Sequence, residues 1–357
     1  TMENNINETV GCDLGDKMSA VCVLDAGGKV TLRTSIRTNR KAMTVFFTRA
    51  PVHVVIEVGT HSRWVGELLE GLGHRVTVAN PRRVKLISQS DRKTDRNDAE
   101  LLARLGRADT GLLSPIRHRQ SQAQADLAVA KARDLLVATR TKLVNHVRGT
   151  VKTFGERLPK CSAESFAKKT RDLIPVPLKA ALEPVYEMLE RLHEQIRGQD
   201  AMIERVAKRY PDVEVVSQIG GVGTLTALVF VLTIEDKSRF AKSRMVGPYL
   251  GLCPRKNQSG SGDPQLRITK AGDPFVRRLL VNAANYVLGP FGKDSDLRRW
   301  GEEIAKRGGK NAKKRARVAV ARKLGVLMHR LWVTGEVYEP LGYGHKAEAP
   351  EPAAAAG

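Results

Sequence analysis

The valine-rich run "VHVVIEVG" (52–59) limits the fold more than any other feature, because a continuously apolar strand needs cover on both faces. Three short segments with strand-like alternation precede it between residues 8 and 36, and a helix is expected over 39–50. A helix and another strand, "HRVTVAN" (74–80), follow it, and Pro81 is placed to begin a further helix. A hairpin sheet that continues into parallel strand–helix units is the layout of the ribonuclease H-like fold, an α/β class.

Two acidic residues stand at the ends of strands in this layout. Asp13 lies at the end of the first strand and Glu57 at the end of the fourth. Ligands of open α/β sheets bind at the carboxyl ends of the strands, near the point where the strand order reverses. If these two strands are neighbours, both carboxylates lie at one edge of the sheet.

Two more acids belong to the stretch "SDRKTDRNDAELLARL" (90–105). A helix is expected over 95–107, in which Asp98, Leu102 and Leu105 share one face. The leucines would turn this face towards the sheet, and Asp95 lies one turn earlier. Four acids from three separate elements can therefore converge.

Each acid also has an ordinary explanation. Asp95 followed by an acid three residues later imitates a capping box, Asp13 can cap a turn, and Glu57 can simply end a strand. Gathered together, however, two carboxylates about 4 Å apart repel by roughly 4 kcal/mol at an effective dielectric constant of about 20. Such hard oxygen ligands suit Mg²⁺ or Mn²⁺, and a pair of these ions can promote phosphodiester cleavage. We therefore interpret the acids as a metal-dependent nucleic-acid site.

The chain carries 60 Lys and Arg against 38 Asp and Glu, a formal net charge of +22, which indicates a polyanionic partner. Ribosomal and packaging proteins are the plain alternative, but they rarely have so large an apolar core. No apolar run is long enough for a membrane span and no signal-peptide pattern is present, so we expect a cytoplasmic, nucleoid-associated protein without a membrane partner. The cysteines, which form no CxxC pair, are expected to be reduced: Cys12, Cys22, Cys161 and Cys253.

The spacing of apolar and charged residues suggests four parts: an α/β domain over 8–150, a helical connector over 151–210, a mostly helical domain over 211–337 and a disordered tail over 338–357. The connector has near-heptad apolar spacing, which fits a two-helix seam, an intermolecular coiled coil or a plain core helix. Pro184 is expected to interrupt the seam and keep it short.

Basic residues cluster in the helical domain. The turn Gly220–Gly223 resembles the hairpin of helix-hairpin-helix modules, whose backbone N–H groups hold phosphates. Residues 306–323 carry nine Lys and Arg, which indicates contact with a nucleic-acid backbone, although a solvated charged face is the alternative. The side chains expected to contact nucleic acid, or else only to add to the basic surface, are Lys256, Arg267, Lys270, Arg277, Arg278, Lys313, Lys314, Arg315 and Arg317.

Motifs along most of residues 8–290 resemble the DEDD transposases of the insertion sequence 110 family, relatives of the Piv/MooV DNA invertases. The first half matches in "VGCDLGD", "VVIEVG", "NPRRVK" and "KTDRNDAELLARL". The second half matches in "IGGVGTLTA", "YLGLCPRKNQSG" and "RITKAGDPFVRRLL". The order of these motifs is the one expected for the family.

The resemblance implies a first domain similar to the Holliday-junction resolvase RuvC, with a metal-binding tetrad that matches Asp13, Glu57, Asp95 and Asp98. It also implies a nucleophilic serine in the second domain, which matches Ser259. That serine would attack a DNA phosphodiester and form a transient phosphoserine link. Known relatives use a structured RNA that pairs with donor and target DNA. They assemble as dimers and tetramers in which the metal site and the serine come from different subunits.

Two stretches depart from the family pattern. The sequence "LGDK" after Asp13 makes Asp16 a rival ligand, and "VGTHSRW" replaces the usual run after Glu57. The loop itself does not single out Ser259, because a serine in a glycine-rich loop is commonly only a flexible polar residue and Ser261 lies beside it. The resemblance selects Ser259.

We therefore expect a site-specific DNA recombinase of a mobile element, with a composite site of acids and serine. The main rival is a hydrolytic nuclease or junction resolvase, in which the same acids would activate water. A third reading is an architectural or RNA-binding protein that has lost catalysis, but all four tetrad positions hold acids.

Overall fold

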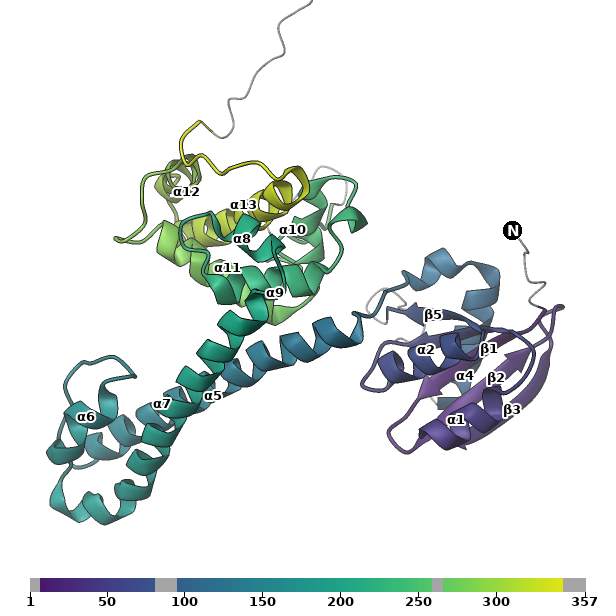
Figure 1. Ribbon diagram of the computed structural model, residues 1–357, viewed down its shortest axis with the longest axis horizontal. Coiled ribbons are helices and arrows are strands. Elements are labelled where there is room, and N and C mark those ends of the chain that lie inside the picture. The colour runs from purple at the N-terminus through teal and green to yellow at the C-terminus, as the bar shows by residue number, and fades with distance from the viewer. Residues whose placement is uncertain (1–6, 81–94, 259–265, 343–357) are drawn as a thin grey trace, which may run out of the picture. The chain divides into compact units, whose positions relative to one another are not determined.

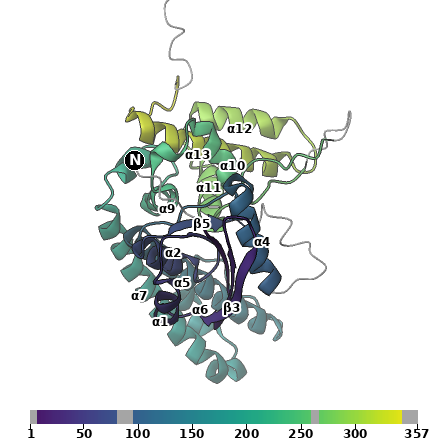
Figure 2. The ribbon, with the colours of Figure 1, turned by 90° about the vertical axis from the view of Figure 1, so that its right-hand side faces the viewer.

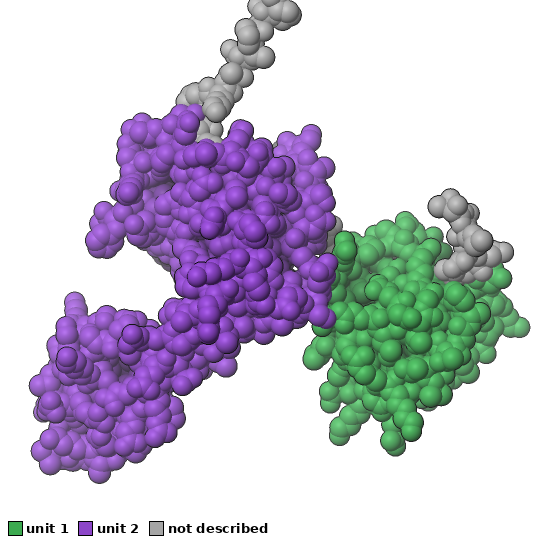
Figure 3. Space-filling model, in the orientation of Figure 1, with its two compact units in different colours: residues 1–118 green, residues 119–357 purple. Residues whose placement is uncertain are grey.

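The computed structural model describes residues 7–80, 95–258 and 266–342, and the chain divides into two compact units, residues 1–118 and 119–357 (Figure 3). This division differs from the expected end of the first domain at residue 150. The reason is the long helix α5 (Ser121–Lys152), which packs against α7 (Lys179–Ala207) and α9 (Thr224–Ile234) within the second unit. By its contacts, α5 therefore belongs with the helical part of the chain.

The first unit contains a five-stranded sheet in the order β3-β2-β1-β4-β5 (Figure 1). The first three strands pair antiparallel, and β1, β4 and β5 run parallel. The bounds of these strands are β1 Thr9–Leu14, β2 Met18–Leu24, β3 Val30–Arg37, β4 His53–Glu57 and β5 Arg75–Ala79. The expected hairpin sheet with parallel additions is confirmed, and this layout is compatible with a ribonuclease H-like domain.

Helices cover both faces of the sheet. On one face, α1 (Arg40–Phe47) and α2 (Ser62–Gly71) bury apolar side chains against the strands. Asn39 is the N-cap residue of α1, because its side-chain oxygen accepts a hydrogen bond of 2.8 Å from the backbone N–H of Ala42. The buried residues of this face are Val10, Cys12, Val21, Val23, Met43, Phe47, Val52, Val54, Ile56, Val65, Leu69 and Val78.

The other face is covered by α4 (Asp95–Ala108), followed by the short 3-10 helix η1 (Thr110–Leu113). The helix lies so close to the sheet that only glycine fits at two contact points. A Cβ on Gly11 would lie 1.9 Å from the carbonyl oxygen of Ala99, and one on Gly106 would lie 2.3 Å from Val55 Cγ2. The expected helix beginning at Pro81 falls outside the described residues.

In the second unit, α5 and α7 form an antiparallel pair whose apolar stripes face each other (Figure 1 and Figure 2). The short helix α6 (Phe166–Thr170) and the 3-10 turns η2 (Arg171–Leu173) and η3 (Val176–Leu178) connect them. Leu182, Tyr186 and Leu189 of α7 are buried in one cluster with Val144 and Val147 of α5, so this part of the seam is covered within the chain. The expected break at Pro184 is wrong, because α7 continues through this residue, which lies only six positions into the helix.

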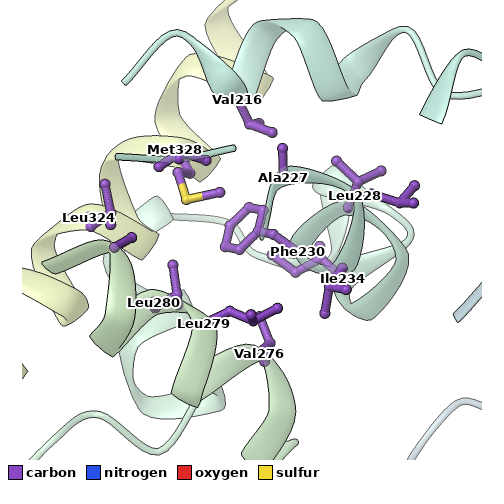
Figure 4. Packing of buried hydrophobic residues seen from close by; sticks show 14 of the residues in the cluster. Val216, Ala227, Leu228, Phe230, Ile234, Val276, Leu279, Leu280, Leu324 and Met328 are labelled. Atoms are coloured by element: carbon purple, nitrogen blue, oxygen red, sulfur yellow. The ribbon is translucent and has the colours of Figure 1, made fainter. Parts of the chain in front are cut away.

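The remaining helices enclose one apolar core. Val216, Phe230, Leu280, Leu324 and Met328 meet there from four different helices (Figure 4). The helix α12 (Asp296–Lys306) lies along α13 (Ala312–Thr334), and the short 3-10 turns η4 (Lys237–Arg239) and η5 (Ser243–Met245) precede α10 (Val246–Tyr249) (Figure 2). Besides α9, the helices of this part are α8 Asp212–Ser217, α10 Val246–Tyr249, α11 Pro274–Val287, α12 Asp296–Lys306 and α13 Ala312–Thr334.

Among the residues that the structure describes, no helix has the length and apolar character required to cross a membrane. The described part of the expected tail, residues 338–342, follows α13 without helix or strand and ends in a turn at 340–342, and residues 343–357 fall outside the described residues.

Candidate active site

The parallel pairing of β1 and β4 places two of the expected acids at one edge of the sheet. Cys12 is aligned with Ile56 in this ladder, so the next residues, Asp13 and Glu57, follow side by side at the carboxyl ends of the strands. Both side chains are half-buried. The condition set from the sequence, that these two strands be neighbours, is therefore met.

The alternation of side chains directs both acids towards α4. Gly11 faces α4, and Asp13 lies two residues further along the same strand, on the same face. Val55 packs in the cluster formed with α4, and Glu57 likewise lies two residues further on. Asp98 comes from α4 itself and is only 8 % exposed. Three carboxyl groups therefore share the layer between the sheet and this helix.

Asp95, the fourth expected acid, is the first residue of α4 and is exposed. Within residues 7–80, 95–258 and 266–342, no group of three or more His, Cys, Asp or Glu side chains is arranged to hold a metal ion. The donors that share the sheet–α4 layer are nevertheless hard carboxylate oxygens, which fit Mg²⁺ or Mn²⁺ in kind. Asp13, Glu57 and Asp98 thus fit a divalent ion by donor type and lie in one layer, but as described their side chains do not form a set that could hold the ion.

Asp16, the rival ligand, lies in the β1–β2 turn and is paired with a histidine. Its carboxylate is 3.5 Å from Nε2 of His61, which follows β4. The indole N–H of Trp64 donates to Nδ1 of His61 over 3.0 Å, so Nε2 carries the ring proton of the neutral imidazole and faces Asp16. The His61 side chain therefore connects the ends of the two strands that carry Asp13 and Glu57. Sequence reasoning treated "THSRW" only as a departure from a pattern, although the i, i+3 spacing of His61 and Trp64 indicated a contact.

Two of the four cysteines, Cys12 and Cys22, belong to the strands β1 and β2. All four are free thiols, and Cys12 and Cys22 are buried in the sheet. Burial raises the pKa of the Cys12 thiol to about 12, and the neighbouring Asp13 carboxylate contributes in the same direction. Cys12 is therefore a neutral packing residue beneath the acids.

In the second unit, residues 251–255 and 267–270 form a short antiparallel ribbon, which we call the serine ribbon. It flanks the serine loop, the part of the chain that contains Ser259 and Ser261. Pro254 and Ile268 form a β-bridge, and three backbone hydrogen bonds in total flank this bridge. These bonds are Arg255 N–H to Arg267 O at 3.0 Å, Thr269 N–H to Cys253 O at 2.9 Å and Lys270 N–H to Gly251 O at 3.1 Å. The ribbon sets where the loop leaves and re-enters the fold.

Ser259 and Ser261 fall outside the described residues. The basic side chains expected to accompany them, Lys256, Arg267 and Lys270, are exposed on the two flanks of the loop. Their positions are consistent with a phosphate held beside the loop, and this contact stays a prediction.

Comparison with known protein families gives two matches. A model for the DEDD transposases of IS110, described as "Transposase", matches residues 10–155. A second model, described as "Transposase IS116/IS110/IS902 family", matches residues 213–297. The chain belongs to the IS110 family of DEDD transposases. It is accordingly a DNA transposase, an enzyme that cuts and rejoins DNA, and the resemblance stated from the motifs is confirmed.

Three similar proteins cover between 77% and 92% of the chain. The transposase for insertion sequence element IS1111A of Coxiella burnetii is 28% identical over 337 residues, which is 92% of this chain and 90% of that protein. The transposase for insertion sequence element IS1328 of Yersinia enterocolitica is 29% identical over 77% of this chain and 82% of its own length. The pilin gene-inverting protein of Moraxella bovis is 24% identical over 78% of this chain and 79% of its own length. Membership of the DEDD family implies use of a divalent metal, and transposition implies DNA substrates.

Two arginines of the transposase have contacts that the sequence did not predict. Arg277 donates from Nη1 to the carbonyl oxygens of Leu250 and Ala271, at 3.0 and 2.7 Å, and so joins α11 to the base of the serine ribbon. Arg278 pairs with Asp134 of α5 at 2.5 Å. These contacts give both residues a structural role, and their expected contact with nucleic acid stays a prediction.

The first half of α13 has one buried and one basic face. Ala312, Ala316 and Val320 are buried against the core. The residues between them, Lys313, Lys314, Arg315 and Arg317, are all exposed, which confirms that they form a solvent-facing basic surface. This surface has the charge required to follow a DNA backbone.

The glycine turn Gly220–Gly223 lies between α8 and α9, and its expected likeness to the hairpin of a helix-hairpin-helix module stays a prediction. Gly221 has φ of +91°, and a Cβ there would lie 2.8 Å from the Tyr286 ring. Tyr286 on α11 therefore lies directly against the turn. Phosphate binding by the turn stays a prediction.

Proposed function

We propose that this transposase cuts and rejoins DNA through a covalent link to Ser259, with Asp13, Glu57, Asp95 and Asp98 as its metal-binding tetrad. The proposal is supported chiefly by the placement of Asp13, Glu57 and Asp98 in one layer between the sheet and α4. A divalent ion, Mg²⁺ or Mn²⁺, would supply positive charge that stabilises the oxygens of the reacting phosphodiester.

The proposed reaction leaves the number of phosphate ester bonds unchanged. The Oγ atom of Ser259 attacks phosphorus and its proton passes to a carboxylate. The P–O bond to one DNA strand end breaks, and the released oxygen takes up that proton, so the strand end leaves with a hydroxyl group. The hydroxyl of another strand end then attacks the phosphoserine and restores a DNA phosphodiester. Rejoining needs no external energy source, because one ester bond is formed for each one that is broken.

Recognition of donor and target DNA is assigned to the exposed basic surface of α13, Lys313, Lys314, Arg315 and Arg317, and to Lys256, Arg267 and Lys270 beside the serine loop. A structured guide RNA, and assembly into dimers and tetramers, are proposed on the family resemblance. The role of the RNA is tested by deleting the sequence that flanks the gene and expressing the protein from a separate copy of the gene. Loss of recombination that is restored by the transcript alone supports guidance by RNA.

The excised circle of the element gives the decisive test. The gene with its native flanks is placed in a heterologous host, and the junction of the circle is amplified for wild type, Asp98→Ala and Ser259→Ala. We expect the junction in wild type only. Ser261→Ala is the matched control in the same loop and is expected to retain the junction. A junction that survives Ser259→Ala would contradict the serine mechanism.

A hydrolytic nuclease or junction resolvase is the second candidate, since the sheet order and the three shared carboxylates would suit it without any serine. Such an enzyme leaves free DNA ends. A covalent protein–DNA ester that alkali cleaves would exclude this candidate.

A further inference from the structure

The loop between α11 and α12 presents one aromatic ring to solvent. Phe291 is 79 % exposed, the highest value among the exposed large apolar side chains of the described residues. Burial of a phenylalanine ring is strongly favourable, so the exposed position of Phe291 gives up this contribution to folding. A single exposed ring does not by itself indicate a function, and the construction of the loop is the informative observation.

Arg298 braces this loop from within. Its Nη1 atom donates to the carbonyl oxygens of Val287, Gly289 and Gly292, at 3.0, 2.7 and 2.8 Å. Its Nε atom donates to Glu302 at 2.9 Å, which fixes the guanidinium on α12. Charged hydrogen bonds to three carbonyls hold the loop on both sides of Phe291 in one shape. The ring is therefore displayed by a rigid support.

The two glycines beside Phe291 are required by this tight shape. A Cβ on Gly289 would lie 2.8 Å from the carbonyl oxygen of Asn285. A Cβ on Gly292 would lie 2.2 Å from the carbonyl oxygen of Val287 and 2.7 Å from Nη1 of Arg298. The backbone must therefore pass so close to α11 that no other residue fits, which again favours a defined position for Phe291.

The loop begins beside the glycine turn. Tyr286, which contacts Gly221, accepts a hydrogen bond at its carbonyl oxygen from the N–H of Gly289, over 3.0 Å. Tyr286 is itself 45 % exposed, and Lys293, two residues after Phe291, is also exposed. The loop that carries Phe291 and Lys293 thus begins near a residue that contacts a glycine turn at the start of a helix. This combination suits a nucleic acid, whose bases stack on rings and whose phosphates attract N–H groups and lysine.

We propose that Phe291 is a stacking site for an unpaired base of the DNA that this transposase holds. Strand cutting and exchange expose unpaired bases, and a flat ring on a rigid support can cover the face of one base without regard to its identity. The formal net charge of +22 disfavours close approach of a second basic surface and favours a polyanion. The proposal rests on DNA binding by the family and is independent of Ser259 and of the metal chemistry.

Equilibrium binding of the full chain to two labelled DNAs tests the proposal. One DNA is a duplex with a short unpaired stretch, and the other is the fully paired duplex of the same length. Removal of one base–aromatic contact weakens binding by a factor of about ten. We expect Phe291→Ala to lose about this factor on the DNA with unpaired bases and to change binding of the paired duplex less than about twofold. Phe291→Trp is expected to retain or improve binding of the unpaired DNA.

Salt dependence and a control variant separate stacking from other effects. The slope of log affinity against log salt is expected to be unchanged in Phe291→Ala, because no phosphate contact is lost. Phe154→Ala removes another exposed ring, 49 % exposed just after α5, and is expected to bind both DNAs like wild type. Equal losses on both DNAs, or no loss on either, would overturn the proposal. A fall in oligomer mass in Phe291→Ala, with unchanged affinity for unpaired DNA, would instead identify a protein contact and would also overturn it.

Discussion

A Cβ on Gly11 would lie 1.9 Å from the carbonyl oxygen of Ala99, so β1 and α4 approach each other more closely than any larger residue allows. This contact sets the distance between two catalytic candidates. Asp13 follows Gly11 by two residues on the same strand face, and Asp98 immediately precedes Ala99 on the helix. The placement of the carboxylates therefore depends on a residue that has no side chain of its own.

Gly11→Ala is expected to push α4 away from the sheet. Overpacking of this kind costs about 1–3 kcal/mol in free energy of unfolding, and contact with backbone atoms leaves little room to relax. We expect a lower melting temperature and loss of DNA cleavage. Gly71→Ala is the control in the same unit, since a Cβ at this exposed helical position meets nothing within 4 Å. A Gly11→Ala variant with wild-type stability and cleavage would contradict the close-approach account.

Asp98→Asn is expected to remove metal binding without unfolding the domain. A ligand that binds only the folded state stabilises it, by about 2.7 kcal/mol at a concentration of 100 times its dissociation constant. Thermal unfolding with and without Mn²⁺ should therefore show a rise in melting temperature for wild type that Asp98→Asn lacks. Glu70→Gln changes an exposed acid on α2 and should keep the wild-type response. An Asp98→Asn variant with the full Mn²⁺ response would exclude Asp98 as a ligand.

His53 is expected to make folding of the first unit sensitive to mild acid. Burial lowers the pKa of His53 from 6.5 to about 4, with the nearby Arg75 charge adding to the effect, and the ring is hydrogen-bonded to Thr77 at 2.9 Å. Because the folded state resists protonation, the unfolded state binds more protons between these two pKa values. The stability from neutral His53 is therefore present above pH 6.5 and is lost as the pH falls towards 4, by roughly 3 kcal/mol at most.

Denaturant unfolding at neutral pH and at lower pH values, in steps of about one pH unit, measures this effect. His53→Gln should show a shallower loss of stability over the same range. His146→Gln, which changes an exposed histidine of α5, is the matched control. Identical pH profiles for wild type and His53→Gln would show that His53 is not the responsible group.

Lys314→Ala and Arg317→Ala are expected to weaken DNA binding through lost phosphate contacts. Each contact contributes about 0.9 to the slope of log affinity against log salt on duplex DNA. Each variant should reduce this slope by about that amount for any duplex sequence. Lys306→Ala is the control, because Lys306 is paired with Glu303 at 2.7 Å and its charge is already compensated. Unchanged slopes in both α13 variants would mean that this basic face is only solvated.

The sequence was sufficient for the sheet and for the acid-bearing elements, because their signals are local. The apolar run at 53–57 predicts a buried strand, and the spacing of Asp98 and Leu102 predicts the buried face of a helix. Contacts between distant segments leave weaker signals. From the sequence, Arg277 was expected to be a surface cation, because nothing near it along the chain indicates a partner. In the structure it donates to the carbonyl oxygens of Leu250 and Ala271 and so holds the backbone of the serine ribbon.

Pro184 was misjudged for a related reason. A proline removes one backbone hydrogen bond, but the long seam of α7 against α5 supplies enough burial to continue the helix through it. For the candidate site, the family resemblance was needed to select Ser259, because loop composition does not distinguish a nucleophile from an ordinary serine. Three carboxylates could be placed by register and helix periodicity, whereas the pairing of Asp16 with His61 required the fold.

The most direct test of the central claim is to trap the covalent intermediate. The transposase is incubated with Mg²⁺ and with DNA and RNA from its native flanks, then denatured, digested and examined by mass spectrometry for a nucleotide-linked serine. We expect an alkali-labile adduct on Ser259 in wild type and in Ser261→Ala, and none in Ser259→Ala or Asp98→Asn. Cleaved DNA with free ends and no serine adduct in wild type would contradict the account and would identify a hydrolytic enzyme.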